Sequence, residues 1–244
     1  MVGGRIVVTD DERSVDTQML GFTVSPHEEC AVEEAVRLSE EQGGTVGVLS
    51  LGAPEAAEQL RAALSVGAHE AYLLQTRDDF GPIGTARAIT AAILALETDR
   101  GRPFDLLLFG NEAADTGDYQ VGVRVAHALG RPCATGIKRL SVEGETLTAS
   151  RQYRGCEERF VLSLPAVVTV KEGINLPRYP SLPGRMRAKK APVHVSEPVF
   201  TPDHLQMERL HVPRTERRSA EVLGYGVDAV PVLVSLLVEL GVVQ

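Results

Sequence analysis

The fold class depends on residues 104–122, FDLLLFGNEAADTGDYQVG. The first six are apolar except for Asp105, as in a strand that is buried on both faces of a parallel sheet. A loop containing Gly110 and Gly117 follows, and a helix is expected over 121–129. This order of strand, loop and helix predicts one unit of an α/β fold.

The residues before this stretch repeat the same order. Strand-like runs alternate with segments whose apolar residues recur at helical spacing. The expected strands cover 5–9, 45–51 and 70–74, and the expected helices cover 28–42, 56–66 and 85–96. Alternation of this kind predicts a parallel sheet with right-handed crossovers over the first part of the chain.

The pattern changes after Pro132. Two strands, 137–142 and 146–153, flank a turn at Glu143-Gly144, and a further strand pair is expected within 160–170. These strands predict a β-hairpin extension. Residues 173–192 contain four prolines and little periodicity, which indicates a long functional loop or a linker. An apolar helix with an early proline is expected over 227–240.

The composition excludes several classes of protein. With 25 basic and 33 acidic residues the net charge is −8, which disfavours nonspecific binding to nucleic acid. The cysteines are three in number and far apart, which argues against a disulfide framework and favours a reducing compartment. No apolar run has the roughly 20 residues of a membrane helix, and the N-terminus has no signal-peptide pattern. We therefore expect a cytoplasmic protein without direct membrane insertion.

The loop after the 104–109 strand is the first candidate site. In a parallel sheet, ligands bind beyond the carboxyl ends of the strands, where helix N-termini offer free N–H groups. Gly117 and Gly122 have the spacing of a P-loop, but Val123 and Arg124 occupy the positions of its Lys and Ser/Thr. The residues therefore predict either a nucleotide-phosphate site without Mg²⁺-dependent hydrolysis or an ordinary strand–helix loop.

Other catalytic and metal-binding templates are absent from the sequence. There is no G-x-S-x-G or H-E-x-x-H motif, and the six histidines show no ligand spacing. The acidic run 10–12 is interpreted as a solvated turn. Glu28 and Glu29 stand at an expected helix start, where they complement the helix dipole. No metal site and no catalytic residue are predicted.

The second candidate site is a basic segment, PRYPSLPGRMRAKK at 177–190. Five basic residues and no acidic residue lie between Arg178 and Lys190, together with the apolar Leu182 and Met186. An apolar tip surrounded by cations suits docking on an acidic partner, with charge setting the encounter rate. The alternative is a solvated linker. The residues predicted to bind a partner are Arg178, Leu182, Arg185, Met186, Arg187, Lys189 and Lys190.

The whole pattern resembles the beta subunit of electron transfer flavoprotein, nearly from end to end. The resemblance rests on SPHEECAVEEA at 25–35, RAALSVGA at 61–68, the 115–122 loop and LPAVVTV at 164–170. The most diagnostic stretch begins N-x-P-R-Y at Asn175 and continues through Leu182-Pro183-Gly184 to Ala188-Lys189-Lys190.

This resemblance implies an α/β fold of the adenine nucleotide alpha hydrolase-like or flavodoxin-like kind, with a C-terminal arm that wraps around a partner. It also implies an electron carrier that is not itself an enzyme, although it could form part of an electron-bifurcating complex. Redox-active FAD would be shared with an alpha subunit, and the chain itself would hold AMP or a second FAD. Its electron partners would be dehydrogenases and a quinone-reductase-type acceptor. The implied nucleotide-site residues are Thr9, Ser25, His27, Leu51, Gly52, Gly110, Asn111, Asp115, Thr116, Gly117, Asp118, Tyr119, Gln120, Val121 and Gly122.

Two domains follow from the same resemblance. Residues 1–192 would form the nucleotide-binding domain, including the recognition loop 173–192, and residues 193–244 would pack on the alpha subunit. The sequence departs from the family at Thr9, Ser25, His27 and Tyr119, and the connection 10–24 is short. These departures leave AMP and a second FAD as alternatives. A stand-alone nucleotide-binding regulator of the universal-stress type is the competing hypothesis for the whole chain.

Overall fold

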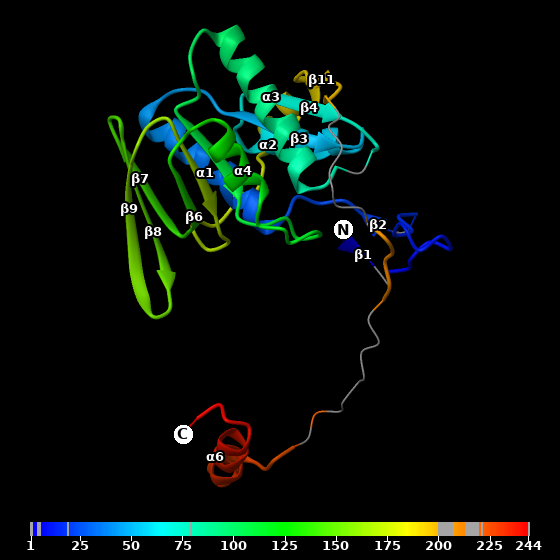
Figure 1. Ribbon diagram of the computed structural model, residues 1–244, viewed down its shortest axis with the longest axis vertical. Coiled ribbons are helices and arrows are strands. Elements are labelled where there is room, and N and C mark those ends of the chain that lie inside the picture. The colour runs from blue at the N-terminus through cyan, green and yellow to red at the C-terminus, as the bar shows by residue number, and fades with distance from the viewer. Residues whose placement is uncertain are drawn as a thin grey trace.

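The computed structural model describes residues 2–3, 6–18, 20–78, 80–199, 207–212, 220 and 222–243 (Figure 1). The helices are α1 (Pro26–Gln42), α2 (Ala56–Val66), α3 (Pro82–Arg100), α4 (Val121–Ala128), α5 (Leu182–Lys190), the short 3₁₀ helix η1 (Gly226–Ala229) and α6 (Val230–Glu239). The strands are β1 (Val2–Gly3), β2 (Leu20–Gly21), β3 (Gly47–Gly52), β4 (Glu70–Gln75), β5 (Leu106–Gly110), β6 (Cys133–Ile137), β7 (Arg139–Glu143), β8 (Thr146–Tyr153), β9 (Cys156–Ser163), β10 (Ala166–Val170) and β11 (His194–Ser196).

Two three-stranded parallel sheets form the centre of the α/β fold, as the sequence predicts. One has the strand order β5-β10-β6 and the other has the order β11-β4-β3. Strand β10 is buried at every position and lies in register with β5, with Val168 opposite Leu108. It is therefore the central strand of its sheet.

Helices cover both parallel sheets. Helix α1 packs on β5 and β10, α2 packs on β3 and β4, and α3 packs on β3 and α4. Pro26 lies in the first turn of α1, where proline is tolerated. Gly43 ends the helix with a φ of 80°, a conformation that favours glycine.

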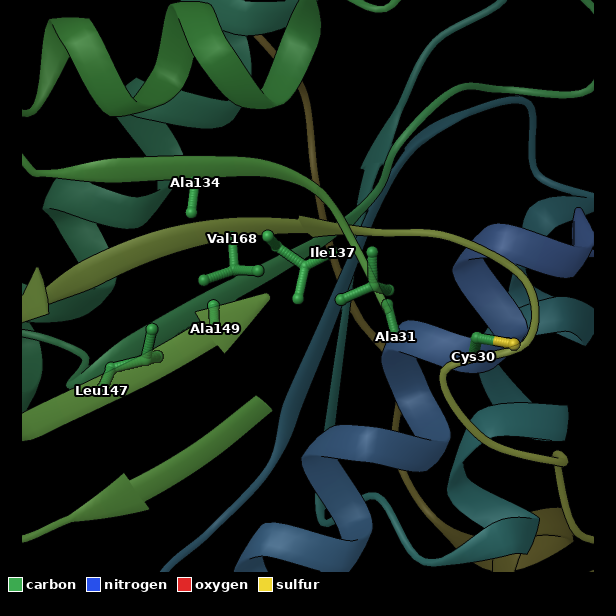
Figure 2. Packing of buried hydrophobic residues seen from close by; sticks show 8 residues of the cluster. Cys30, Ala31, Ala134, Ile137, Leu147, Ala149 and Val168 are labelled. Atoms are coloured by element: carbon green, nitrogen blue, oxygen red, sulfur yellow. The ribbon is translucent and has the colours of Figure 1, made fainter. Parts of the chain in front are cut away.

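The predicted hairpin extension is an antiparallel sheet of three strands, in the order β7-β8-β9. Leu147 and Ala149 of β8 are buried where this sheet meets α1 and the parallel sheet. Figure 2 shows these two residues with Ala31 of α1, Ile137 of β6 and Val168 of β10. The hairpin extension thus shares a core with the parallel sheet.

The expectation of a strand pair within 160–170 was wrong, because the two strands of this region do not pair with each other. Strand β9 alternates between exposed and half-buried residues and pairs with β8, whereas β10 is buried on both faces and joins β5 and β6. The alternation in β9 is typical of an antiparallel sheet with one solvent-exposed face. The continuous apolar sequence of β10 is typical of a strand buried within a parallel sheet.

The expectation of a loop throughout 173–192 was also wrong, since residues 182–190 form α5. The Ser181 side chain accepts a hydrogen bond from the Gly184 N–H at 3.2 Å and caps the helix. Gly184 and Ala188 are buried, and α5 packs on α2. Two small residues four positions apart give no apolar periodicity, so the sequence pattern does not reveal this helix.

The expected first strand, 5–9, is not part of either parallel sheet in its described residues 6–9. Val8 forms one isolated antiparallel bridge with Val15, and the side chains of Ile6 and Val7 are 53% and 49% exposed. The run has strand-forming residues but makes only local contacts here. Residue 5 lies outside the described residues.

The C-terminal helix α6 lies apart from the sheets in Figure 1, and among the described elements it packs mainly on η1. Within the described part of the chain, no helix is long and apolar enough to cross a membrane.

Candidate nucleotide site and recognition helix

The predicted nucleotide loop leaves the carboxyl end of β5 and leads into α4. It reverses direction through Gly117 and Tyr119, which have φ values of 61° and 57°. The Gly117 N–H donates to the Ala113 carbonyl at 3.0 Å, and the Thr116 N–H donates to Asp115 Oδ1 at 2.8 Å. The loop is therefore a defined turn at the carboxyl edge of the sheet.

A buried hydrogen-bond chain holds the start of this loop to the sheet. Thr169 of β10 donates from Oγ1 to Asn111 Oδ1 at 2.8 Å and accepts from the Gly136 N–H at 3.0 Å. Thr169 is only 3% exposed. Asn111, a predicted site residue, thus also anchors the loop to its neighbouring strands.

Helix α4 approaches the sheet closely at Gly122. A Cβ atom at this position would lie 2.8 Å from Thr169 Cγ2 and 3.2 Å from the Phe109 ring. The structure therefore gives Gly122 a packing role between α4, β5 and β10. The first turn of α4 has no side-chain cap, so its N–H groups remain available at the carboxyl edge of the sheet.

Glu28 lies on the opposite side of this edge, in the first turn of α1. It accepts a hydrogen bond from Ser25 Oγ, and its carboxylate fills the space in which a side chain at Gly110 would lie. Burial, together with the charges of Asp115 and Glu112, raises the pKa of Glu28 from 4.5 to about 7. The Glu28 carboxyl can therefore be neutral near neutral pH.

His27 and Glu112 lie near Glu28 at the carboxyl edge of the sheet. His27 Nδ1 lies 3.9 Å from Glu112 Oε1 and has no hydrogen-bond partner among the described residues, although the atom is buried. Within the described residues, no group of three or more His, Cys, Asp or Glu side chains could hold a metal ion.

A cavity of about 840 Å³ opens beneath the loop. It runs between β3 and β5, with α1 on one side and α3 on the other. The predicted site residues that line it are Gly110, Asn111, Thr116, Asp118, Tyr119, Gln120, Val121 and Gly122. Those that do not line it are Thr9, Ser25, His27, Leu51, Gly52, Asp115 and Gly117.

Sequence reasoning missed Glu28 and Thr169 at this site. From the sequence alone, Glu28 is interpreted only as a complement to the helix dipole. Ser25 and Glu28 have the S-x-x-E spacing of a capping box, which would have placed their side chains together. Thr169 has no comparable signal, because its contact with Asn111 joins residues 58 positions apart.

The second candidate site is helix α5. Leu182 and Met186 are 73% and 60% exposed, while Gly184 packs against the Ser65 carbonyl of α2. Arg187, Lys189 and Lys190 lie in the last turn, where cations interact favourably with the helix dipole. Arg185 and these three cations have no ion-pair partner among the described residues. An apolar pair and free cations therefore share one exposed helix.

Arg178 differs from these cations because it is fully engaged within the chain. Its Nε lies 3.0 Å from Glu33 Oε2, and its Nη1 lies 2.6 Å from Glu40 Oε1. Hydrogen bonds to Glu40 and Glu33 raise the pKa of Arg178 above its usual value. Asn175 adds a bond of 2.8 Å from Nδ2 to Glu34 Oε2, so this segment is tied to α1 at two points.

Comparisons with known proteins agree on one family. The model of the electron transfer flavoprotein domain matches residues 14–199. The chain is 38% identical to the electron transfer flavoprotein subunit beta of Bacillus subtilis (strain 168) over 176 residues, which is 72% of this chain and 67% of the relative. It is 33% identical to the human subunit of the same name over 242 residues, 97% of this chain and 92% of the relative. A third relative is the caffeyl-CoA reductase-Etf complex subunit CarD of Acetobacterium woodii, 35% identical over 173 residues, 70% of this chain and 65% of that protein.

Proposed function

The chain belongs to the electron transfer flavoprotein beta-subunit family, and on this basis we propose that it binds an adenine nucleotide and shares a redox-active FAD with an alpha subunit. The FAD supplies the redox chemistry when bound, and this chain's own residues position nucleotide and partner. The bound nucleotide in this chain is AMP or a second FAD. The three free cysteines support a reducing compartment, and we place the protein in the cytoplasm.

One observation carries the nucleotide proposal: the uncapped N-terminus of α4 opens onto the cavity between β3 and β5. Free N–H groups at a helix N-terminus attract a phosphate. Gln120 and Val121 line the cavity at this point. A phosphate bound here would contact backbone donors and would need no metal ion.

The acidic side chains at the carboxyl edge of the sheet are compatible with an anionic ligand, because the Glu28 carboxyl can be protonated and uncharged near neutral pH. A protonated Glu28 carboxyl does not repel a phosphate and can donate a hydrogen bond. Asp115 is exposed, so solvent screens its charge. The residues present therefore fit the phosphate of a nucleotide.

Helix α5 is proposed as the surface that recognises electron partners. Leu182 and Met186 would enter an apolar pocket of the partner, and the free cations of α5 would steer an acidic surface towards it. The name of CarD places that relative in a complex with a reductase, which supports exchange of electrons with a dehydrogenase or reductase. A quinone-reductase-type acceptor would use the same exposed helix.

The experiment is to co-express the chain with its alpha subunit, purify the complex, denature it and identify the released nucleotides by chromatography. We expect FAD together with AMP, or FAD at twice the molar amount of the complex. A colourless homodimer that binds ATP would contradict the proposal and favour a stand-alone regulator. An isolated, monomeric chain that keeps stoichiometric FAD would contradict the shared-flavin arrangement.

A further inference from the structure

The segment before α5 is held on α1 by an arginine that bridges two carboxylates. Nε and Nη2 of Arg178 donate to the Glu33 carboxylate at 3.0 Å, and Nη1 donates to Glu40 Oε1 at 2.6 Å. The backbone N–H of Arg178 also donates to Glu33 Oε2, at 3.1 Å. Glu33 and Glu40 lie about two turns apart on α1. Arg178 is therefore fixed to one helix through both its side chain and its backbone.

The α1 side of this contact is buried. Glu33 and Glu34 are both buried although they are acidic, and each carboxylate has a basic partner, Arg178 or Arg37. Nδ2 of Asn175 donates to Glu34 Oε2 at 2.8 Å and to the Cys30 carbonyl at 3.0 Å. A buried carboxylate is unfavourable unless it is paired and hydrogen-bonded. Residues 175–178 therefore cannot leave α1 without a cost in free energy.

Helix α5 is fixed at a second place, on α2. A Cβ atom at Gly184 would clash with the Ser65 carbonyl, so the two helices are in close contact there. Leu182 lies between Arg178 and Gly184 in the chain, and only residues 179–181, which include Pro180, separate it from Arg178. The two fixed points on either side of Leu182 therefore set the direction in which its side chain leaves the surface.

We propose that Arg178 is a positioning residue for partner recognition, which does not contact the electron partner but orients α5 so that Leu182 and Met186 face it. This inference rests on the proposed function of α5. The donors of the Arg178 guanidinium are already directed to Glu33 and Glu40, whereas Leu182 and Met186 are exposed. A surface that is ordered before the encounter loses less conformational entropy on docking, which favours the complex.

The positioning role predicts a response to salt that differs from that of the free cations. The contact between Arg178 and the buried Glu33 is screened little by salt, because burial limits the access of ions. Steering by exposed cations such as Lys189 fades as salt is added. Loss of the Arg178 guanidinium should therefore weaken docking at low and at high salt alike.

The first test is Arg178→Gln in the purified complex with the alpha subunit, with Arg131→Gln as the matched control. Arg131 also pairs with a carboxylate, that of Glu97 at 2.6 Å, and it belongs to neither α1 nor α5. We expect Arg178→Gln to raise the KM for the electron partner about threefold or more, at high salt as well, with the limiting rate unchanged. Arg131→Gln should leave both constants unchanged. An unchanged KM in Arg178→Gln would overturn the inference.

The second test repeats Arg178→Gln in a complex that already carries Leu182→Ala and Met186→Ala. If Arg178 acts through these two side chains, its substitution has little further effect on the KM once they are absent. Fold-changes that multiply in the combined variant would show that Arg178 contacts the partner itself, and would overturn the inference.

Glu40→Gln keeps the inference testable if Arg178→Gln does not fold. Glu40 is exposed, so this variant weakens the bridge without leaving a buried charge unpaired. The KM should rise, and the amides of Gly184 and Arg185, which bond to Ser181, should exchange hydrogen faster. No change in either measurement would overturn the inference.

Leu182→Ala alone separates this inference from the proposed function. If Leu182→Ala leaves the KM unchanged, α5 is not the recognition surface, and the positioning role is overturned with it. If Leu182→Ala raises the KM but Arg178→Gln and Glu40→Gln do not, α5 keeps its proposed function and only the role of Arg178 is overturned.

Discussion

Leu182 and Arg178 are close in the sequence, but the Leu182 side chain is exposed whereas the Arg178 side chain is held in ion pairs. Leu182 is 73% exposed at the start of α5, and the Arg178 guanidinium is held by Glu33 and Glu40 of α1. Both were predicted to bind a partner from charge and composition. Leu182 and the free cations of α5 are exposed and available for the proposed partner, whereas the ion pairs of Arg178 hold the segment that precedes α5 on α1.

We predict that Leu182→Ala slows electron exchange with the partner by about tenfold or more. Burial of this side chain in a partner pocket would contribute about 1.5–3 kcal/mol, and alanine would lose most of it. Flavin content and melting temperature should change little, because the side chain is exposed in the folded chain. Stopped-flow kinetics of the reduced partner measures the effect.

The control for this variant is Leu94→Ala on α3, since Leu94 is 50% exposed and lies far from α5 in sequence. It should leave partner kinetics unchanged. If Leu182→Ala also leaves them unchanged, α5 is not the recognition surface. Removal of the cations of α5 should slow electron exchange with the partner at low salt and have much less effect at high salt.

We predict that Glu28 makes the folded chain less stable as the pH rises. Burial raises the pKa of Glu28 from 4.5 to about 7, so its stabilising effect is fully present below pH 4.5. Between these two values the unfolded chain loses the proton while the folded chain keeps it, and that stability is lost as the pH rises through about 7. Glu28→Gln should remove this dependence.

Urea denaturation at about pH 5 and about pH 8 measures the free energy of unfolding of both proteins. The unsubstituted chain should lose stability relative to Glu28→Gln between these conditions. Glu29→Gln is the control, because Glu29 is the exposed neighbour in the same helical turn. Parallel pH profiles for the unsubstituted chain and Glu28→Gln would show that the carboxyl is already ionised at the lower pH.

At the scale of the elements, the contact of α4 with β10 depends on Gly122, because glycine has no side chain. A Cβ at Gly122 would lie 2.8 Å from Thr169 Cγ2, and Thr169 cannot move freely because it bonds Asn111 and Gly136. Helix α4 and the nucleotide loop are therefore positioned together. A change at this contact should affect stability and nucleotide binding at the same time.

We predict that Gly122→Val destabilises the chain by about 1–3 kcal/mol, because the added methyl groups overpack this contact. Loss of nucleotide should follow from displacement of α4. Gly47→Ala is the control, since its Cβ would make an ordinary contact at 3.5 Å with Tyr72. Thermal denaturation and nucleotide content should be measured together. Loss of nucleotide at unchanged stability would instead assign Gly122 to direct ligand contact.

At the scale of the whole molecule, α6 is an element with little internal packing among the described residues. None of its residues is buried, and the exposed apolar residues include Val230, Val232, Leu233, Val234, Val238 and Leu240. An apolar helix of this kind is stable when another surface covers it. Strand β11 differs, because it pairs with β4 although it lies beyond the proposed boundary at residue 192.

We predict that removal of residues 222–244 abolishes co-purification with the alpha subunit. The melting temperature of the truncated chain alone should match that of the full chain alone, because α6 packs mainly on η1 among the described elements. Co-expression followed by size-exclusion chromatography measures the assembly. A truncated chain that still forms the complex would exclude α6 as the main docking element.

The sequence by itself determined the alternation of strands and helices, the hairpin extension and the position of the loop after β5. These features depend on local patterns: apolar periodicity, glycines at helix ends and a turn at Glu143-Gly144. The bounds of α2 were predicted to the residue, Ala56–Val66. The two candidate sites were also predicted from local patterns, because each centres on one continuous segment.

Only the tertiary structure decided which strands pair, which polar groups are buried and which cations are free. The pairing of β10 with β5, the raised pKa of Glu28 and the engagement of Arg178 by Glu33 all depend on segments far apart in the chain. Local patterns carry no information about such contacts. The short helix α5 was missed for the same reason, since its stability depends on packing of Gly184 and Ala188 against α2 and not on its own periodicity.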